Sequence, residues 1–199
     1  MKIVFATGNA HKLEELREIT ELVTGDANFI EFSTPPKPFD PDENGTTFAA
    51  NSLIKAREAN RLTGMMTLAD DSGLCVEALD GRPGLYSARY APTQVEKIEK
   101  LLAEMDGKTN RRAKFVCAMT LLNEKGEILC QECGECHGEI ALKPDGTNGF
   151  GFDPVFIPDE QNPNKITLAQ MSDIEKNTIS HRANALKSVL RYLSEKVSR

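Results

Sequence analysis

The spacing of apolar residues changes along the chain between a strand pattern and a helix pattern. Residues 3–6 form a continuous, partly β-branched apolar run, which predicts a short buried strand. From residue 13 onward apolar residues recur every three or four positions, which predicts a helix with one apolar face. These residues are Leu13, Leu16, Ile19 and Val23. Between the two segments Gly8 gives backbone freedom and Asn9 is a natural helix N-cap.

Similar patterns predict the remaining elements. A Pro-rich segment over residues 35–41 is neither helix interior nor central strand, so it predicts a loop. The predicted elements after it are a helix from about Thr46 to near Gly64, a strand over 65–69 that ends at the acidic pair, an extended piece over 74–79, an amphipathic helix behind a Thr93–Glu96 capping box, two long strands over 112–122 and 127–136, a turn-rich segment over 144–154, a short helix opened by Ser172 and Glu175, and a last helix over 186–197. Helices mixed with strands at both ends, around a long hairpin, predict an α/β fold with a mixed sheet.

Composition and charge narrow the class of protein. The chain has 199 residues, 40% hydrophobic and 27% charged, which is typical of one compact globular unit. Its net charge of −6 is not the footprint of a general nucleic-acid binder. The longest apolar run is too short to span a bilayer and the start lacks a signal peptide, so we expect a cytoplasmic protein without a membrane partner.

Five cysteines leave a choice between core residues and a metal site. Cys75 and Cys117 lie in apolar, strand-like runs and are expected to be reduced. Cys130, Cys133 and Cys136 have metal-ligand spacing, but a zinc site usually needs a second pair of ligands. On an extended strand every third residue changes face, so we favour a structural role over metal binding.

Charged residues stand at two helix starts where the helix dipole disfavours a cation. Lys12 lies in the first turn of the first helix, and His181 and Arg182 lie where the last helix begins. With the amides of the preceding turn, Lys12 could bind a phosphate, although a solvated lysine is an equally good interpretation.

Two acidic segments supply oxygen ligands or a general base. Asp70 and Asp71 follow a buried strand, and their adjacent side chains should point in different directions and have different roles. A turn that begins with Asx residues is the alternative. Glu43 precedes a helix and would complete a Mg²⁺ site if it faced Asp71.

In the loop over 149–154 two glycines alternate with two phenylalanines. The aromatic rings either pack in a turn or stack on a nucleobase. Together with the preceding segments it forms four ordered motifs: residues 7–12, 69–74, 149–154 and 179–182. In these motifs the chain closely resembles the inosine/xanthosine triphosphate pyrophosphatase family, from Lys2 to about Leu190. The segments Phe48–Ala56 and Pro83–Tyr90 are similar to further family signatures.

The resemblance implies an elongated mixed β-sheet flanked by helices, with two lobes and an active-site cleft between them, within a single domain over residues 1–199. It implies hydrolysis of ITP, dITP or XTP to the monophosphate and pyrophosphate with Mg²⁺, by a homodimer that binds a purine nucleoside triphosphate and no nucleic acid. Asp71 would be the catalytic base and, with Glu43, a metal ligand. The implied substrate-binding residues are Thr7, Gly8, Asn9, Ala10, His11, Lys12, Lys55, Ser72, Phe150, Gly151, Phe152, Asp153, Lys176, His181 and Arg182, and Arg89 is a weaker candidate for a phosphate contact.

Within this assignment the phosphates would lie on the Thr7–Lys12 turn and Lys55, and the base on Phe150. A donor from Arg182 or protonated His181 would pair with the 6-oxo group of the base, where adenine has a competing donor. The alternatives are a related pyrophosphatase for modified pyrimidine or standard nucleotides, a non-catalytic nucleic-acid-binding module, and a metal or redox module built on the cysteine cluster.

Overall fold

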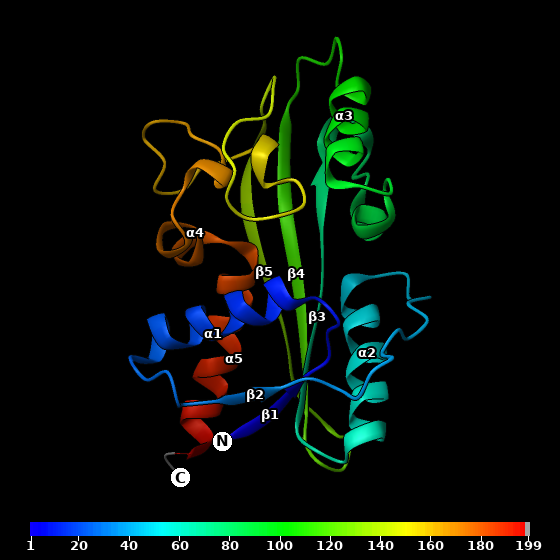
Figure 1. Ribbon diagram of the computed structural model, residues 1–199, viewed down its shortest axis with the longest axis vertical. Helices are drawn as coiled ribbons and strands as arrows, with labels where there is room; N and C mark the ends of the chain where they lie inside the picture. The colour runs from blue at the N-terminus through cyan, green and yellow to red at the C-terminus, as the bar shows by residue number, and fades with distance from the viewer. Residues whose placement is uncertain (198–199) are drawn as a thin grey trace. The chain divides into compact units, whose positions relative to one another are not determined.

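The structure, a computed structural model, describes residues 1–197 (Figure 1). Its strands are β1 (Lys2–Phe5), β2 (Glu31–Ser33), β3 (Thr67–Val76), β4 (Arg112–Leu122), β5 (Ile128–Ile140) and β6 (Phe156–Pro158). Its α-helices are α1 (Ala10–Thr24), α2 (Phe48–Thr63), α3 (Gln94–Glu104), α4 (Asp173–Ile179) and α5 (His181–Val197), with short 3₁₀ turns at Glu77–Leu79, Gly84–Arg89, Asp153–Val155 and Leu168–Gln170.

The six strands form one mixed sheet in the order β2-β1-β3-β4-β5-β6. Strand β1 pairs in parallel with β2 and β3, whereas β5 and β6 are antiparallel. A tight turn joins β4 to β5, in which the Asn123 N–H donates to the Glu127 carbonyl at 3.0 Å. The predicted α/β class with a mixed sheet is therefore confirmed.

The chain divides into two compact units. The first unit contains residues 1–71, 117–134 and the chain from residue 182 onward. The second contains residues 72–116 and 135–181. Each unit has its own hydrophobic core, so each is described separately below.

The core of the first unit has two layers, one on each face of the sheet. Along β1, Ile3 and Phe5 pack in one cluster while Val4 and Ala6 pack in another, as the period of two along a strand requires. Helices α1 and α5 cover the first face and α2 covers the second (Figure 1). On α2 the contacts to the sheet come from small residues such as Ala56 and Ala59.

The core of the second unit joins α3 to the sheet and to the segment after β5. Ile98 and Leu101 of α3 lie in the same buried cluster as Phe115 and Phe156. The rings of these two phenylalanines lie 4.7 Å apart between centroids. At that spacing an aromatic pair contributes beyond the area it buries.

Most predicted elements are confirmed, including the Asn9 cap of α1 and the capping boxes at Thr93 and Ser172. The prediction that a strand ends at Asp70 is wrong, because β3 continues from Thr67 to Val76. The prediction missed β2 and β6, since each has only three residues and shows no measurable period. None of the helices within residues 1–197 has the length and apolarity to cross a membrane.

One glycine in the second unit permits the close approach of β5 and β6. A Cβ atom on Gly138 would lie 2.2 Å from the carbonyl oxygen of Ile157. Replacing glycine by alanine at an unstrained site usually stabilises a protein by about 0.4–1 kcal/mol through the unfolded chain. For Gly138→Ala we expect the opposite sign, a loss of about 1–3 kcal/mol, measured by urea unfolding. Stability equal to or above that of the parent would contradict this packing argument.

Candidate active site

The acidic pair of β3 sends its two carboxylates to opposite faces of the first unit. Asp70 follows Leu68 onto the face covered by α1 and α5, and Asp71 follows Ala69 onto the face covered by α2. Both side chains are buried, with 1% and 8% of their surface exposed. The prediction that they point in different directions is confirmed, although they lie in the middle of a strand and not at its end.

Asp70 is the centre of a buried ion cluster. Its two oxygens accept hydrogen bonds from Lys12 Nζ at 3.1 and 3.0 Å. Arg182 donates to Asp70 Oδ2 through Nε at 3.3 Å and Nη2 at 3.0 Å, and pairs with Glu15 through Nη1. The Cys117 thiol lies 4.0 Å from the same carboxylate oxygen. The cluster therefore joins α1, β3, β4 and the first turn of α5.

The charges of this cluster support one another's ionised state. Burial alone would raise the pKa of Asp70, but Lys12, Arg182 and Lys55 outweigh burial and hold that pKa well below its ordinary range. Burial would lower the pKa of Arg182, yet Asp70 and Glu15 raise it above its usual value. Burial and the nearby Asp70 charge raise the pKa of the Cys117 thiol, which stays protonated. Asp70 is thus an ionised anchor for two cations.

Asp71 has a different set of partners on the other face. Asn51 Nδ2 donates to Asp71 Oδ2 at 3.1 Å, and Lys55 Nζ donates to Asp71 Oδ1 at 3.1 Å. The same Lys55 nitrogen also donates to Glu43 Oε2 at 3.2 Å. Burial would lower the pKa of Lys55, but the charges of Asp70, Asp71 and Glu43 raise it overall. Glu43 and Asp71 therefore converge on one cationic nitrogen.

This convergence is a test of whether the site fits a divalent ion. Carboxylate oxygens are the ligands that Mg²⁺ prefers, and Mg²⁺ is commonly held by one or two carboxylates together with water and substrate phosphates. Glu43 and Asp71 meet that requirement because one oxygen of each carboxylate lies within hydrogen-bond distance of the same atom, Lys55 Nζ. Within residues 1–197 no group of three or more His, Cys, Asp or Glu side chains could hold a metal by itself. The residues fit an ion that arrives with a phosphate ligand.

The turn between β1 and α1 forms one wall of a pocket of about 660 Å³ in the first unit. Asn9 caps α1 by accepting from the His11 N–H at 3.0 Å, and its own N–H donates to Thr7 Oγ1 at 3.1 Å. His11 itself is exposed. The residues that line the pocket are Thr7, Gly8, Asn9, Ala10, Leu13, Thr34, Pro35, Lys37, Pro38 and Phe39. Four of the predicted substrate-binding residues, Thr7, Gly8, Asn9 and Ala10, therefore line one pocket, and sequence reasoning missed Lys37 beside them.

In the second unit the predicted base-binding residues surround a buried ion pair. Lys176 Nζ donates to Asp153 Oδ2 at 2.8 Å, and the Phe150 N–H donates to the same oxygen at 2.8 Å. Lys176 Nζ also lies 4.9 Å from the centroid of the Phe150 ring. Gly149 has a φ of +71°, and a Cβ there would lie 2.1 Å from Asp153 Oδ2. The loop conformation thus depends on Asp153 and on the missing side chain at Gly149.

Other predicted residues of the second unit have structural contacts. The Phe152 ring is 3% exposed and packs edge-on against Tyr90 at 6.0 Å between centroids, so the ring is part of the core of this unit. The His181 ring stacks on Phe115 at 4.7 Å. Gly151 adopts a φ of +64° in the same loop as Phe150. Ser72 is half-buried on β3.

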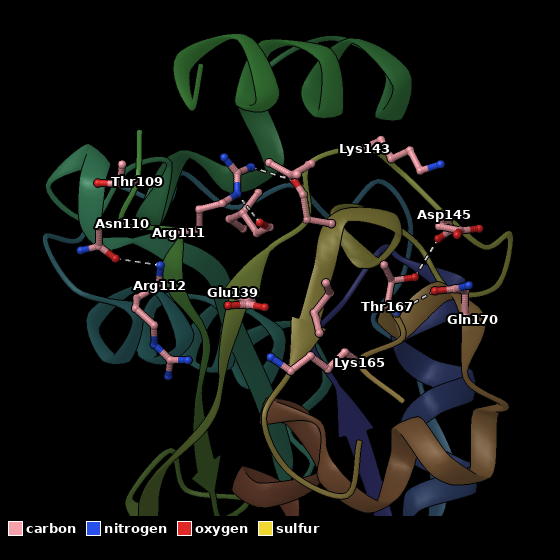
Figure 2. A pocket seen from close by; sticks show the side chains of 14 residues that line it. Thr109, Asn110, Arg111, Arg112, Glu139, Lys143, Asp145, Lys165, Thr167 and Gln170 are labelled. Atoms are coloured by element: carbon pink, nitrogen blue, oxygen red, sulfur yellow. Dashed lines mark hydrogen bonds between the residues drawn. The ribbon is translucent and has the colours of Figure 1, made fainter. Parts of the chain in front are cut away.

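Figure 2 shows a different pocket in the second unit, of about 620 Å³. Its lining residues lie at 109–112, 139–143, 145, 157, 165, 167 and 170, and no predicted site residue is among them. Its arginines are engaged in the fold. Arg111 donates to the carbonyl oxygens of Ile140 and Ala141, and Arg112 pairs with Asp159 at 2.6 Å.

All five cysteines are free thiols in the part of the chain that the structure describes. Of the three closely spaced ones, Cys130 is half-buried, Cys133 is exposed and Cys136 is buried, so they do not share one environment. Burial raises the pKa of Cys136 to about 12 and that of Cys130 to about 11.

Comparison with known proteins decides the family. The model of the Ham1 family matches residues 3–192. The chain belongs to the Ham1 family. It is 41% identical over 189 residues to a protein of Nostoc sp. named dITP/XTP pyrophosphatase, covering 94% of this chain and 92% of that one. A Prochlorococcus marinus protein of the same name is 37% identical over 194 residues, covering 98% and 97%.

Solved Ham1 structures share the fold. The HAM1 protein from Coxiella burnetii superposes with a TM-score of 0.83 at 38% identity, covering 98% of this chain and 99% of that one. The Staphylococcus aureus Ham1 protein gives 0.82 at 35% identity, covering 98% and 100%. The family resemblance inferred from the four motifs is thereby confirmed.

In this Ham1 family member the predicted residues form two groups, one in each unit. The first unit contains the turn over 7–12, Glu43, Lys55, Asp71 and Arg182, and the second contains Ser72, residues 150–153, Lys176 and His181. Sequence reasoning missed Glu15, and it included Asn51 only as part of the signature-like segment Phe48–Ala56, without a role. A usable signal existed for both contacts, because Glu15 lies three residues after Lys12 and Asn51 lies four residues before Lys55, spacings that share a helix face.

The Asp70 cluster predicts a pH-dependent loss of stability. Replacing one partner of a buried ion pair leaves uncompensated charge, so Asp70→Asn should cost about 3–5 kcal/mol of unfolding free energy at pH 7. Because the folded pKa of Asp70 lies below its ordinary value of 3.8, its stabilisation is present above about pH 4 and is lost as pH falls further. Urea unfolding between pH 7 and pH 3 should show the parent's advantage shrinking below pH 4.

The matched control is Asp159→Asn, which removes a surface pair with 44% of each side chain exposed. We expect this variant to lose less than about 1 kcal/mol. An Asp70→Asn loss no larger than the Asp159→Asn loss would contradict the anchoring role.

Proposed function

We propose that this protein hydrolyses deaminated purine nucleoside triphosphates (ITP, dITP and XTP) to the monophosphate and pyrophosphate, and so removes them from the nucleotide pool. The observation that carries the proposal is the convergence of Lys55 on both Glu43 and Asp71, next to the Asp70–Lys12–Arg182 cluster. The names of the Nostoc and Prochlorococcus relatives support the same activity.

The charge balance of the first unit suits a triphosphate that arrives with a divalent cation. The charged groups of its two ion clusters are Lys12, Lys55 and Arg182 with Glu15, Glu43, Asp70 and Asp71. Each of these three cations is already paired with a carboxylate, so a bound triphosphate would call for a further cation. We therefore propose Mg²⁺ as cofactor, held by Glu43 and Asp71. When bound, Mg²⁺ would neutralise phosphate charge and polarise a phosphoryl oxygen.

The residues of this chain supply the remaining chemistry. Asp71 would accept the proton of the attacking water, because its carboxylate lies beside Glu43 at the proposed metal site. Lys12, Lys55 and the N–H groups of the turn over 7–10 would bind the phosphates and stabilise the charge that develops on the departing pyrophosphate. Each of these donors is already oriented by a carboxylate or by the start of α1.

The second unit offers the chemistry for a base. Phe150 is half-buried and its ring lies under Lys176, which leaves an aromatic plane beside charged donors. A buried donor left facing the amino group of adenine costs about 1–3 kcal/mol, whereas the 6-oxo group of hypoxanthine accepts it. His181 remains the second-unit candidate for that donor. Arg182 is the first-unit candidate, and its guanidinium is oriented by Asp70 and Glu15.

We also propose a homodimer, on the family resemblance, together with a cytoplasmic location and no nucleic-acid partner. The acidic composition supports the last point, because a net charge of −6 disfavours binding to a phosphate backbone.

A substrate panel tests the proposed function directly. Pyrophosphate release is measured from ITP, dITP, XTP, GTP, ATP and dUTP, each with and without Mg²⁺. We expect release from ITP, dITP and XTP only with Mg²⁺, and a kcat/KM for ATP lower by about 10⁴-fold. Preference for dUTP or for ATP would favour a related pyrophosphatase, and absence of hydrolysis would favour a binding module.

A conservative change at Asp71 tests the assigned base. Asp71→Asn keeps the shape but cannot accept a proton, so kcat for ITP should fall by about 10²–10⁴-fold while nucleotide binding is retained. Binding is measured by calorimetry and turnover by pyrophosphate release, with Asp159→Asn as the control carboxylate. Turnover of Asp71→Asn equal to that of the parent would remove Asp71 from this role.

A further inference from the structure

One buried amide on α2 joins the proposed base to the segment that carries the proposed metal ligand. Asn51 is 1% exposed and lies in the first unit. Its Nδ2 donates to Asp71 Oδ2 at 3.1 Å, and its Oδ1 accepts from the Gly45 N–H at 2.8 Å. Gly45 lies two residues after Glu43, so a single side chain bridges both halves of the proposed Mg²⁺ site.

The orientation of this amide is determined by its two neighbours. The Gly45 N–H can only donate, so the group facing it must be the amide oxygen. The amide nitrogen therefore faces Asp71, whose carboxylate can accept. With Lys55 on Oδ1 and Asn51 on Oδ2, each oxygen of Asp71 has a fixed donor.

The local packing makes this bridge specific to asparagine and glycine. A Cβ on Gly45 would lie 2.6 Å from Asn51 Oδ1 and 2.8 Å from Ala50 Cβ. Any larger residue at position 45 would push the segment of Glu43 away from α2. A charged side chain at position 51 would place a second carboxylate, or a second cation, against Asp71. A neutral amide supplies one donor and one acceptor without changing the charge of the site.

We infer that Asn51 is a positioning residue for the proposed hydrolysis, which holds the Asp71 carboxylate in register with the Glu43 segment through its bridge to Gly45. This inference rests on the proposed function and deepens it. It assigns a role to a residue that acts through its hydrogen bonds to Asp71 and Gly45. Such outer partners of metal ligands typically contribute about 10–100-fold in metal affinity or activity.

The chain contains a matched control on the same helix. Asn60 also lies on α2 and is buried, but its Nδ2 donates to the backbone carbonyls of Met65 and Asn123 at 2.8 and 2.9 Å. Changes at Asn60 remove a buried amide without touching Asp71 or Gly45. They report the cost of losing a structural hydrogen bond alone.

The kinetic test compares Asn51→Asp with Asn60→Asp. Asn51→Asp keeps the acceptor for Gly45 and removes the donor to Asp71. We expect kcat for ITP to fall by about 10–100-fold while KM changes less than threefold. Asn60→Asp should lower the melting temperature and leave kcat and KM of the folded protein unchanged. Equal kcat for Asn51→Asp and the parent, or the same kcat loss in Asn60→Asp, would overturn the inference.

A second measurement is independent of turnover. Mn²⁺ binding in the presence of inorganic pyrophosphate, which supplies the phosphate ligands, is followed by electron paramagnetic resonance for the parent, Asn51→Ala and Asn60→Ala. We expect the Kd of Asn51→Ala to rise about tenfold or more and that of Asn60→Ala to stay at the parent value. Unchanged Mn²⁺ affinity in Asn51→Ala would contradict the inference. If the parent binds Mn²⁺ but hydrolyses none of the triphosphates, the proposed function fails while this comparison still decides the role of Asn51.

Discussion

The buried carboxylate of Asp70 is the constraint on which the first unit depends. Lys12 lies 58 residues before it and Arg182 lies 112 residues after it, yet both donate to the same group. An ionised carboxylate with 1% exposure is tolerable only with such partners, because an unpaired charge in the interior costs several kcal/mol. Folding of α1, β3 and the start of α5 is therefore coupled through one side chain. The same coupling holds two cations in place before any ligand arrives.

The consecutive residue Asp71 uses the same strand for a different purpose. The pleat of β3 separates the two carboxylates, so that one is surrounded by α1 and α5 and the other by α2. The negative charges of Asp70 and Asp71 both raise the pKa of Lys55. Asp70 thus pairs with Lys12 and Arg182, whereas Asp71 accepts hydrogen bonds from Lys55 and Asn51 of α2. The two adjacent acidic residues have different partners because successive side chains of a strand point to opposite faces of the sheet.

The sequence alone predicted many of the residues in this arrangement. Its predictions were wrong where contacts with distant residues outweigh the local conformational preference of a segment. Lys12 and Arg182 were conspicuous because the dipole of their helices disfavours a cation in the first turn, and both turn out to pair with Asp70. The segment Asp70–Gly73 has the composition of a turn, which is why a break in the strand was predicted. Buried cations satisfy the carboxylates and allow β3 to continue. Glu15 was missed, and Asn51 received no role, although helical spacing links them to Lys12 and Lys55.

The position of the acidic pair within a strand has a consequence for chemistry. In a loop, the direction in which a carboxylate side chain leaves the backbone depends on the loop conformation. In the middle of a hydrogen-bonded strand, the sheet fixes that direction. Asn51 and Lys55 then restrict only the remaining rotation of the Asp71 side chain, one donor on each oxygen. Precise chemistry requires groups whose rotamers are fixed by packing and by a second layer of hydrogen bonds. The mixed sheet supplies the first requirement here, and helix α2 supplies the second.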